Sequence, residues 1–158
     1  MKIREIVLSF DFYISIFLVI VCFYFFPWWI NNQIATKLYE IGISVLSIVF
    51  SVFFAALAII ITSPDDDFVK FLEEKEDYTG LVDTFKFSLF SLFVALCYSI
   101  ILTAITANWI SQKHINQQVI FILVYIFLFS YSLLAALISA NDAIQFAKYR
   151  TVFLKGRE

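Results

Sequence analysis

Four long apolar stretches, separated by short polar ones, dominate the pattern of residues along the chain. Each is longer than the ~20 residues that an α-helix needs to cross a ~30 Å hydrocarbon core. The stretches are continuous and do not alternate with polar residues, so they do not fit the strands of a membrane β-barrel. We predict an all-α, polytopic membrane protein whose single domain, residues 1–158, has four transmembrane helices, at about 6–30, 34–62, 83–110 and 117–147.

Small side chains recur every three or four residues along the second, third and fourth predicted helices. In lipid, a face of small residues lets two backbones approach closely and drives helix association by packing. The first helix is rich in Phe instead, so we place it at the periphery of the bundle or in a subunit contact. The pattern leaves open whether the small faces meet within one subunit or between subunits. The predicted helix-packing residues are Ser44, Ser47, Ser51, Ala55, Ala58, Ser91, Ala95, Ser99, Ala136 and Ala140.

The composition excludes a soluble protein. Charged residues make up only 15% of the chain, against roughly 25% in typical soluble domains. Hydrophobic residues make up 62%, and the mean hydropathy is +0.90. The two cysteines, Cys22 and Cys97, fall at mid-membrane depth, and we interpret them as packing residues. The first apolar run is too long for a signal peptide and lacks a cleavage site, so we expect it to be retained.

The distribution of Lys and Arg predicts the orientation in the plasma (inner) membrane. Of the 11 Lys and Arg residues, only Lys37 and Lys113 lie in the two outer connections. By the positive-inside rule, both termini and the middle polar segment are cytoplasmic. Trp109 lies at the outer end of its helix, as an interfacial anchor does. The basic C-terminal tail supplies candidate contacts to anionic lipid headgroups, namely Lys148, Arg150, Lys155 and Arg157.

The middle polar segment, residues 63–82, is predicted to be a cytoplasmic helical elbow. Ser63 can cap a helix and Pro64 suits its first position, so we expect a short helix to about Glu76 and a break at residues 78–80. The acidic residues lack the EF-hand spacing, so we expect no metal there. They form either a docking site for a basic cytoplasmic partner or a solvated helix N-terminus. The docking candidates are Asp65, Asp66, Asp67, Glu73 and Glu74.

Asp11 is the acidic residue that we expect inside the hydrocarbon boundary of the first helix. Acids at such positions are candidates for proton or cation sites. We place Asp11 about two turns from the cytoplasmic end of the helix. There it is close enough to reach water or to pair with Lys2 or Arg4. Both interpretations stay open.

The sequence contains no GxSxG, P-loop, HExxH or zinc-binding cysteine motif. The single histidine, His114, lies in an outer connection without sequence-local partners for catalysis or metal binding. We therefore predict that the protein is not an enzyme, has no cofactor or metal, and does not bind nucleic acid directly.

The sequence resembles a loose class of small four-helix membrane proteins that are encoded in prokaryotic phage-defence and exclusion loci. Examples are the RexB-type exclusion protein and the membrane subunit of the Kiwa system. The resemblance lies in a second span rich in small residues, a charged elbow and an immediate return: LSIVFSVFFAALAIIIT, SPDDDFVKFLEEKEDYTG and DTFKFSLFSLF. It implies either a channel that dissipates the membrane potential or an oligomeric sensor that recruits a soluble partner. It carries over no residue role.

Three functions follow as hypotheses. The first is an oligomeric inner-membrane protein that acts as a sensor or pore-type effector in phage defence or envelope stress, coupled to a cytoplasmic partner. The second is a small transporter that couples substrate movement to protons through Asp11. The third is a membrane anchor subunit for a soluble enzyme. All three place the protein in the lipid bilayer, and the first requires a homo-oligomer.

Overall fold

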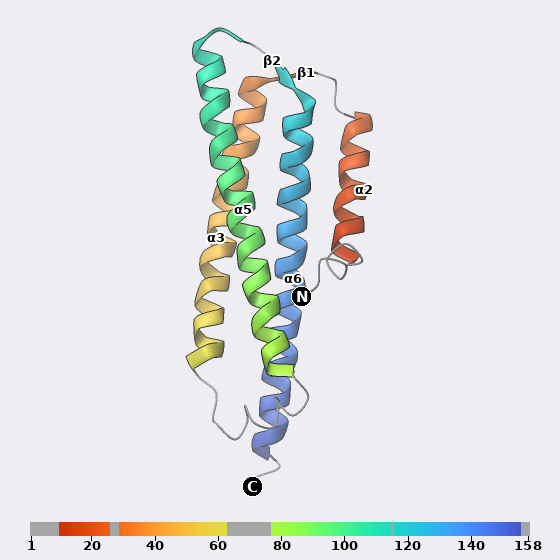
Figure 1. Cartoon of the computed structure of the whole chain (residues 1–158), viewed down its shortest axis with the longest axis vertical. Coiled ribbons are helices and arrows are strands. Elements are labelled where there is room, and N and C mark those ends of the chain that lie inside the picture. The colour runs from red at the N-terminus through yellow and green to blue at the C-terminus, as the bar shows by residue number, and fades with distance from the viewer. Residues whose placement is uncertain (1–9, 26–28, 63–76, 115, 156–158) are drawn as a thin grey trace.

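The computed structural model describes residues 10–25, 29–62, 77–114 and 116–155 (Figure 1). Within these residues the chain is all-helical, as predicted, apart from two strands of three residues each. The helices are α2 (Phe10–Phe25), α3 (Asn32–Thr62), α5 (Asp77–Ser111) and α6 (Val119–Lys155). The strands are β1 (Trp29–Asn31) and β2 (Asn116–Gln118).

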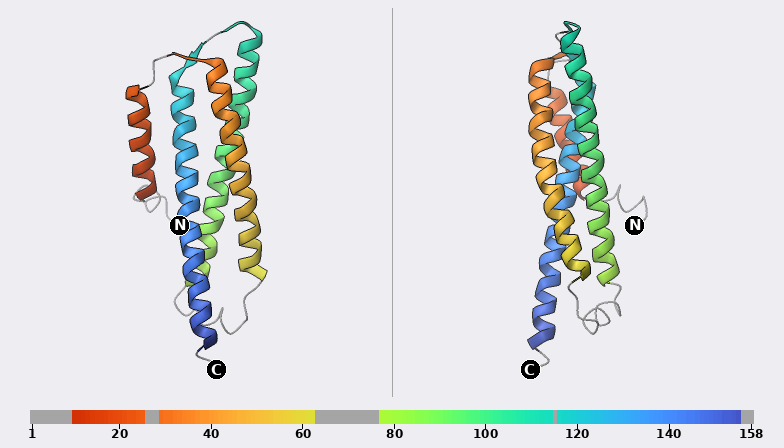
Figure 2. Two further views of the ribbon diagram at one scale, coloured as in Figure 1. Left: turned by 180° about the vertical axis from the view of Figure 1, so that it is seen from behind. Right: turned by 90° about the vertical axis from the view of Figure 1, so that its left-hand side faces the viewer.

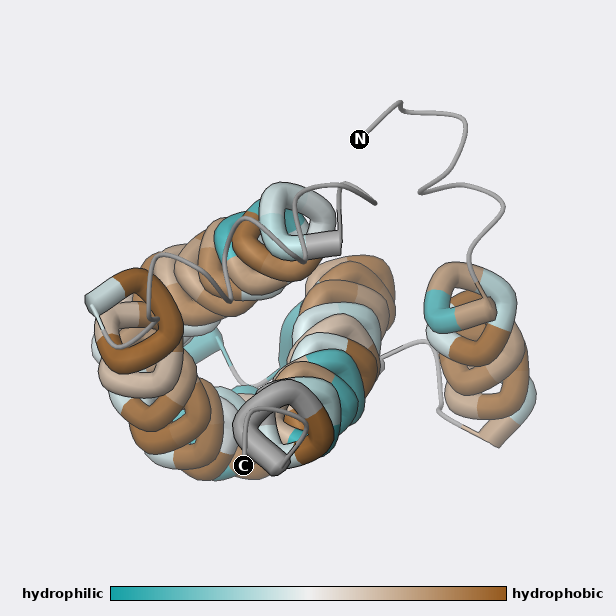
Figure 3. The backbone as a smooth tube through the Cα atoms, turned by 90° about the horizontal axis from the view of Figure 1, so that it is seen from below, coloured by the Kyte–Doolittle hydropathy of each residue, from teal (hydrophilic) through white to brown (hydrophobic). Residues whose placement is uncertain are grey.

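The four helices run alternately up and down along one common axis (Figures 1 and 2). α3, α5 and α6 pack against one another, and α2 packs on α6. Seen from below, α2 lies beside α6 on the far side from α3 (Figure 3). This arrangement agrees with the expected packed core of three helices and a peripheral first helix.

Three of the helices have the length and apolarity needed to cross a membrane. α3, α5 and α6 contain uncharged stretches at residues 41–62, 87–111 and 119–141. At 1.5 Å per residue these stretches are roughly 33–38 Å long, enough for a hydrocarbon core of ~30 Å. α2 is a shorter apolar helix of 16 residues. Helices of this kind indicate a membrane protein.

Side chains from α3, α5 and α6 form the core along the length of these helices. The middle of the core holds Leu46, Leu92, Ala95 and Ala136. The end of the bundle nearest the two strands, which we call the outer end from its predicted side, holds a cluster around Tyr39, Tyr125, Leu102 and Ile122. Because most other large side chains on these helices point outward, the apolar surface of the bundle suits contact with lipid.

The expected break at residues 78–80 is wrong. Residues 77–82 form the first turns of α5, and Leu81 and Phe85 on these turns are buried against Ile60 of α3. Packing of this face keeps the chain helical at Gly80, because one glycine disfavours a helix by only about 1 kcal/mol. The remainder of the predicted elbow, residues 63–76, lies outside the described residues.

The outer connections pair with each other, which the sequence pattern did not predict. β1 and β2 are antiparallel, with Ile30 opposite Gln117 and Asn31 opposite Asn116. The two strands close the end of the bundle at the top of Figure 1. Each strand leads directly into a long helix, so the pairing holds the starts of α3 and α6 together.

Candidate functional site

The small residues predicted on α5 and α6 lie between helices. Ala95, Ser99 and Ala136 are almost completely buried, and Ser91 and Ala140 are half-buried. Ala95 and Ala136 belong to the core cluster among α3, α5 and α6. The faces on these two helices are therefore used within one subunit.

The small residues predicted on α3 lie elsewhere. Ser44, Ser51, Ala55 and Ala58 are exposed, and Ser47 is half-buried. α3 uses other residues, including Leu46 and Ile60, to pack against α5. We call the exposed side the outward α3 face; it consists of Ile41, Ser44, Ile48, Ser51, Val52, Ala55, Ala58, Ile59 and Thr62.

The hydroxyl groups on the outward α3 face are compatible with an apolar surrounding. Ser44 Oγ donates to the carbonyl of Glu40 at 3.0 Å, and Ser51 Oγ donates to the carbonyl of Ser47 at 2.8 Å. Such bonds within one helix satisfy the hydroxyl donors without a partner protein. The face therefore has low polarity and combines small side chains with the exposed aliphatic side chains of Ile41, Ile48, Val52 and Ile59.

A pair of buried serines joins α5 to α6. Ser88 Oγ lies 2.6 Å from Ser139 Oγ, and it donates to the carbonyl of Ala135 at 3.0 Å. Ser139 Oγ lies 3.1 Å from the same carbonyl, so either hydroxyl can donate to Ala135 while the other donates to its partner serine. Hydrogen bonds of this kind between membrane helices contribute about 0.6 kcal/mol on average.

Asp11 lies deeper in the bundle than we expected. It is in the first turn of α2 and only 8% exposed. The ring of the adjacent Phe12 contacts the rings of Phe127 and Tyr131, with centroids 5.8 and 6.5 Å apart. These two α6 residues are near the middle of the uncharged stretch 119–141. Asp11 is therefore close to the middle of the bundle's apolar length.

A second polar residue lies one turn from Asp11 on α2. Ser15, one turn further along, is fully buried and donates to the backbone carbonyl of Asp11 at 2.8 Å. The side of α2 that meets α6 therefore begins with two polar residues in an otherwise apolar helix. Lys2 and Arg4, the expected partners of Asp11, lie outside the described residues.

The charged docking and headgroup candidates are only partly described. Lys148 is exposed near the C-terminal end of α6. Arg150 and Lys155 belong to the same helix, but their side chains are outside the described part of the structure, as is the whole of Arg157. The acidic candidates Asp65, Asp66, Asp67, Glu73 and Glu74 are all outside it too.

A chain of buried hydrogen bonds ties the outer end of the bundle together. Gln117 on β2 is 2% exposed; its Nε2 donates to the hydroxyl of Tyr39 on α3 at 2.7 Å, and its Oε1 accepts from Thr106 on α5 at 3.2 Å. Tyr125 on α6 donates to the carbonyl of Leu38 at 3.1 Å. The Gln117 bonds thus link α3, α5 and β2 in one polar network, which stabilises most when every donor and acceptor in it is paired, and the Tyr125 bond separately joins α6 to α3.

The turn after α5 fixes the position of His114. The amide of His114 donates to the carbonyl of Trp109, and that of Lys113 donates to the carbonyl of Ile110, both at 3.0 Å. Lys113 has a φ of 62°. These bonds and this φ define a Schellman motif, in which glycine is the usual residue at the left-handed position. The motif ends the helix and turns the chain into β2.

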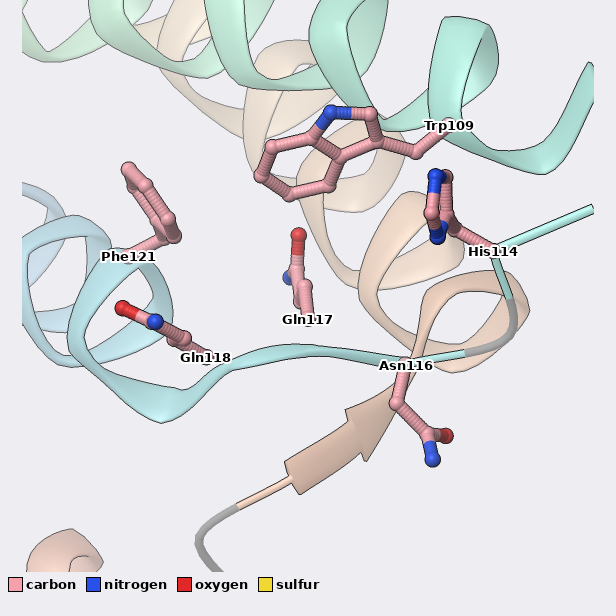
Figure 4. A pocket seen from close by; sticks show the side chains of 6 residues that line it. All are labelled: Trp109, His114, Asn116, Gln117, Gln118 and Phe121. Atoms are coloured by element: carbon pink, nitrogen blue, oxygen red, sulfur yellow. The ribbon is translucent and has the colours of Figure 1, made fainter. Parts of the chain in front are cut away.

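Two hollows open on either side of His114. The larger, of about 350 Å³, is lined by Trp109, His114, Asn116, Gln117, Gln118 and Phe121 (Figure 4). The smaller, of about 270 Å³, is lined by Asn31, Asn32, Gln33, Ile110, Lys113 and His114. Among the described residues no group of three His, Cys, Asp or Glu side chains is placed to hold a metal ion.

The sequence carries a signal for this outer site that we did not use. Ile30-Asn31-Asn32-Gln33 and Ile115-Asn116-Gln117-Gln118 repeat the pattern Ile-Asn-x-Gln. In the strand pairing, Asn31 lies opposite Asn116, its equivalent in the other copy of the pattern. The two connections are therefore related by a local two-fold axis, and a search for short polar repeats would have found both.

No protein-family model, curated protein or solved structure matches this chain. Function therefore has to be argued from the outward α3 face, from Asp11 and from the outer hollows.

Proposed function

We propose that the protein is an oligomeric, multi-pass protein of the inner membrane that senses or executes a response to phage infection or envelope stress. In this proposal all four helices cross the membrane, and both termini face the cytoplasm, where a soluble partner binds. The observation that carries the oligomer is the outward α3 face. The defence role rests on the resemblance described above, which lies in the order of the spans and in their residue composition.

The outward α3 face supports contact with a second copy of the chain. In lipid, bulky apolar side chains fill the space around a helix as well as small ones do, so the small residues of this face gain nothing from exposure alone, whereas they let a second helix approach between the exposed Ile and Val side chains. The corresponding faces on α5 and α6 are buried between helices. When α3 of one copy packs on α3 of another, the same residues meet on both sides, as in a two-fold symmetric dimer.

The pore form of the proposal uses the same face. In a ring of more than two copies, Ser44, Ser51 and Thr62 would bring hydroxyl groups to a central axis. The sensor form needs only the contact between copies and a cytoplasmic partner. A membrane-potential dye separates the two forms, because a pore depolarises the cell on activation and a sensor alone does not.

The decisive experiment replaces a small residue on the outward α3 face by a large one. Ala55→Phe should convert the purified oligomer to a monomer of unchanged helix content, measured by light scattering and circular dichroism in a mild detergent. It should also abolish protection in a phage-plating assay. Ala104→Phe is the matched control, because Ala104 is also exposed but lies on α5.

Two results would contradict this proposal. One is an Ala55→Phe protein that keeps the mass of the wild-type oligomer. The other is an equal loss of mass in Ala104→Phe, which would point to a general effect of the larger side chain. Wild-type protein that gives no protection against a broad set of phages would remove the defence role but leave the oligomer intact.

A proton-coupled transporter is the second candidate function, and the placement of Asp11 favours it. An acid near the middle of the apolar length is a functional candidate by default. Asp11→Asn should abolish proton-coupled flux in liposomes, whereas Asp83→Asn, at an exposed residue of α5, should not. Normal coupled flux in Asp11→Asn would exclude this function.

An anchor subunit remains the third possibility from the sequence. Purification in mild detergent tests it directly. A co-purified soluble protein with enzyme activity would favour the anchor, a co-purified partner without enzyme activity would favour the sensor, and no co-purified protein would favour the transporter.

A further inference from the structure

The lining of the larger outer hollow combines two aromatic rings with uncharged side-chain amides. Trp109 and Phe121 form an aromatic wall, with ring centroids 5.7 Å apart in an edge-to-face contact. Asn116 and Gln118 on β2 are exposed at its side, and among the residues that the structure describes no Asp, Glu, Lys or Arg belongs to its lining. An aromatic wall facing uncharged amides is suited to a neutral ligand with both apolar and polar sides.

The floor of the hollow is held by hydrogen bonds to Gln117. Gln117 rises from β2 toward the indole of Trp109 (Figure 4). Its side chain is held from two sides, by Tyr39 and by Thr106. These two bonds use one of the two amide N–H donors of Gln117, so one donor is left. A polar group that is already positioned costs little ordering when a ligand binds.

A second buried amide on the other side of His114 has an unused acceptor. Asn32 is 1% exposed and lines the smaller hollow. Its Nδ2 donates to the carbonyl of His114 at 2.7 Å, while its Oδ1 is buried without a hydrogen-bond partner. Buried polar atoms without partners are uncommon in native structures and call for an explanation. Because Asn32 lines the smaller hollow, this acceptor does not belong to the lining of the larger one.

We propose that the larger hollow binds a sugar, that is, a neutral ligand rich in hydroxyl groups. Hydroxyl groups both donate and accept hydrogen bonds, as the amide groups of Asn116, Gln117 and Gln118 do. The C–H face of a sugar ring can cover the aromatic wall. The volume of about 350 Å³ is within the range of small-molecule sites, roughly 300–1,000 Å³. In the orientation proposed above, this end would face away from the cytoplasm.

Fluorescence of Trp109 tests the proposal. Trp109 is one of three tryptophans, so a Trp28→Phe/Trp29→Phe background leaves it as the single reporter. The protein is held in phosphatidylcholine nanodiscs, because sugar-based detergents would compete. Chitotriose and maltotriose are titrated, with glycerol as a small polyol control. Both faces of a nanodisc are open, so binding is measured whatever the orientation in the cell.

The expected result is a saturable change in Trp109 emission with at least one of the two sugars and none with glycerol. Gln118→Ala should weaken that affinity about 5-fold, the value for one lost hydrogen bond of ~1 kcal/mol. Gln145→Ala, an exposed glutamine at the other end of α6, should leave it unchanged. Circular dichroism should show that both variants are folded.

Three results would overturn the sugar site. They are no saturable response to either sugar, an equal response to glycerol, and an equal loss of affinity in Gln118→Ala and Gln145→Ala. The oligomer measured with Ala55→Phe is independent of all three, so failure of the sugar site and failure of the proposed function are distinguishable.

Discussion

At the scale of single residues, Gly42 lets the ring of Tyr125 lie directly against α3. A Cβ at position 42 would overlap the Tyr125 hydroxyl oxygen and lie 2.9 Å from Cζ. We predict that Gly42→Ala destabilises the fold by about 1–3 kcal/mol, the usual range for overpacking. The measurement is thermal unfolding in detergent, followed with a thiol-reactive dye that reports the exposure of Cys22 and Cys97.

Gly80 provides the matched control for this substitution. It is exposed in α5, and a Cβ there would meet nothing within 4 Å. Gly80→Ala should therefore stabilise the protein, by up to about 1 kcal/mol, because alanine favours helix. Tyr125→Phe should recover part of the loss caused by Gly42→Ala, since it removes the closest atom. Equal unfolding temperatures for the two alanine variants would contradict the close approach.

At the scale of the elements, the contact between α5 and α6 includes the buried pair Ser88 and Ser139. We predict that Ser88→Ala and Ser139→Ala each cost about 0.5–1.5 kcal/mol, and that the double variant costs less than their sum. Ser130→Ala should be nearly neutral, because the Ser130 hydroxyl bonds to carbonyls of its own helix. Unfolding temperatures measured as above check this, and strictly additive losses would exclude a direct interaction between the two serines.

The elements also show what the sequence could predict and what it could not. The long apolar runs predict α3, α5 and α6, because an apolar run of that length indicates both an α-helix and a position inside the hydrocarbon core. The break expected near Gly80 failed because packing of Leu81 and Phe85 outweighs the preference of one glycine. The strands were missed because β1 meets β2 across more than 80 residues, which no local pattern reports.

The small-residue faces show the same limit at the candidate site. The spacing of Ser44, Ser51 and Ala55 is like that of Ala95 and Ser99, yet the first group is exposed and the second is buried. Spacing identifies a face that can approach another backbone closely. Which neighbour it meets depends on how the long helices are arranged, so the structure was needed to separate the two groups.

At the scale of the whole molecule, the number of membrane crossings depends on the first helix. α2 has 16 residues, so it is about 24 Å long, less than the ~30 Å of the hydrocarbon core. The apolar run predicted at 6–30 is long enough to cross. We therefore predict four crossings, with the β1–β2 end outside and both termini in the cytoplasm, because nine of the 11 Lys and Arg residues lie in the segments assigned to that side.

Single cysteines introduced into a Cys22→Ser/Cys97→Ser background measure this topology with a membrane-impermeant maleimide. Gln33→Cys and Gln112→Cys, both at exposed outer positions, should react in intact cells. Lys148→Cys, exposed on the last part of α6, should react only after the membrane is permeabilised. A cysteine added before Met1 decides the first helix. If it reacts in intact cells together with Gln33→Cys, α2 does not cross, and the protein has three crossings with its N-terminus outside.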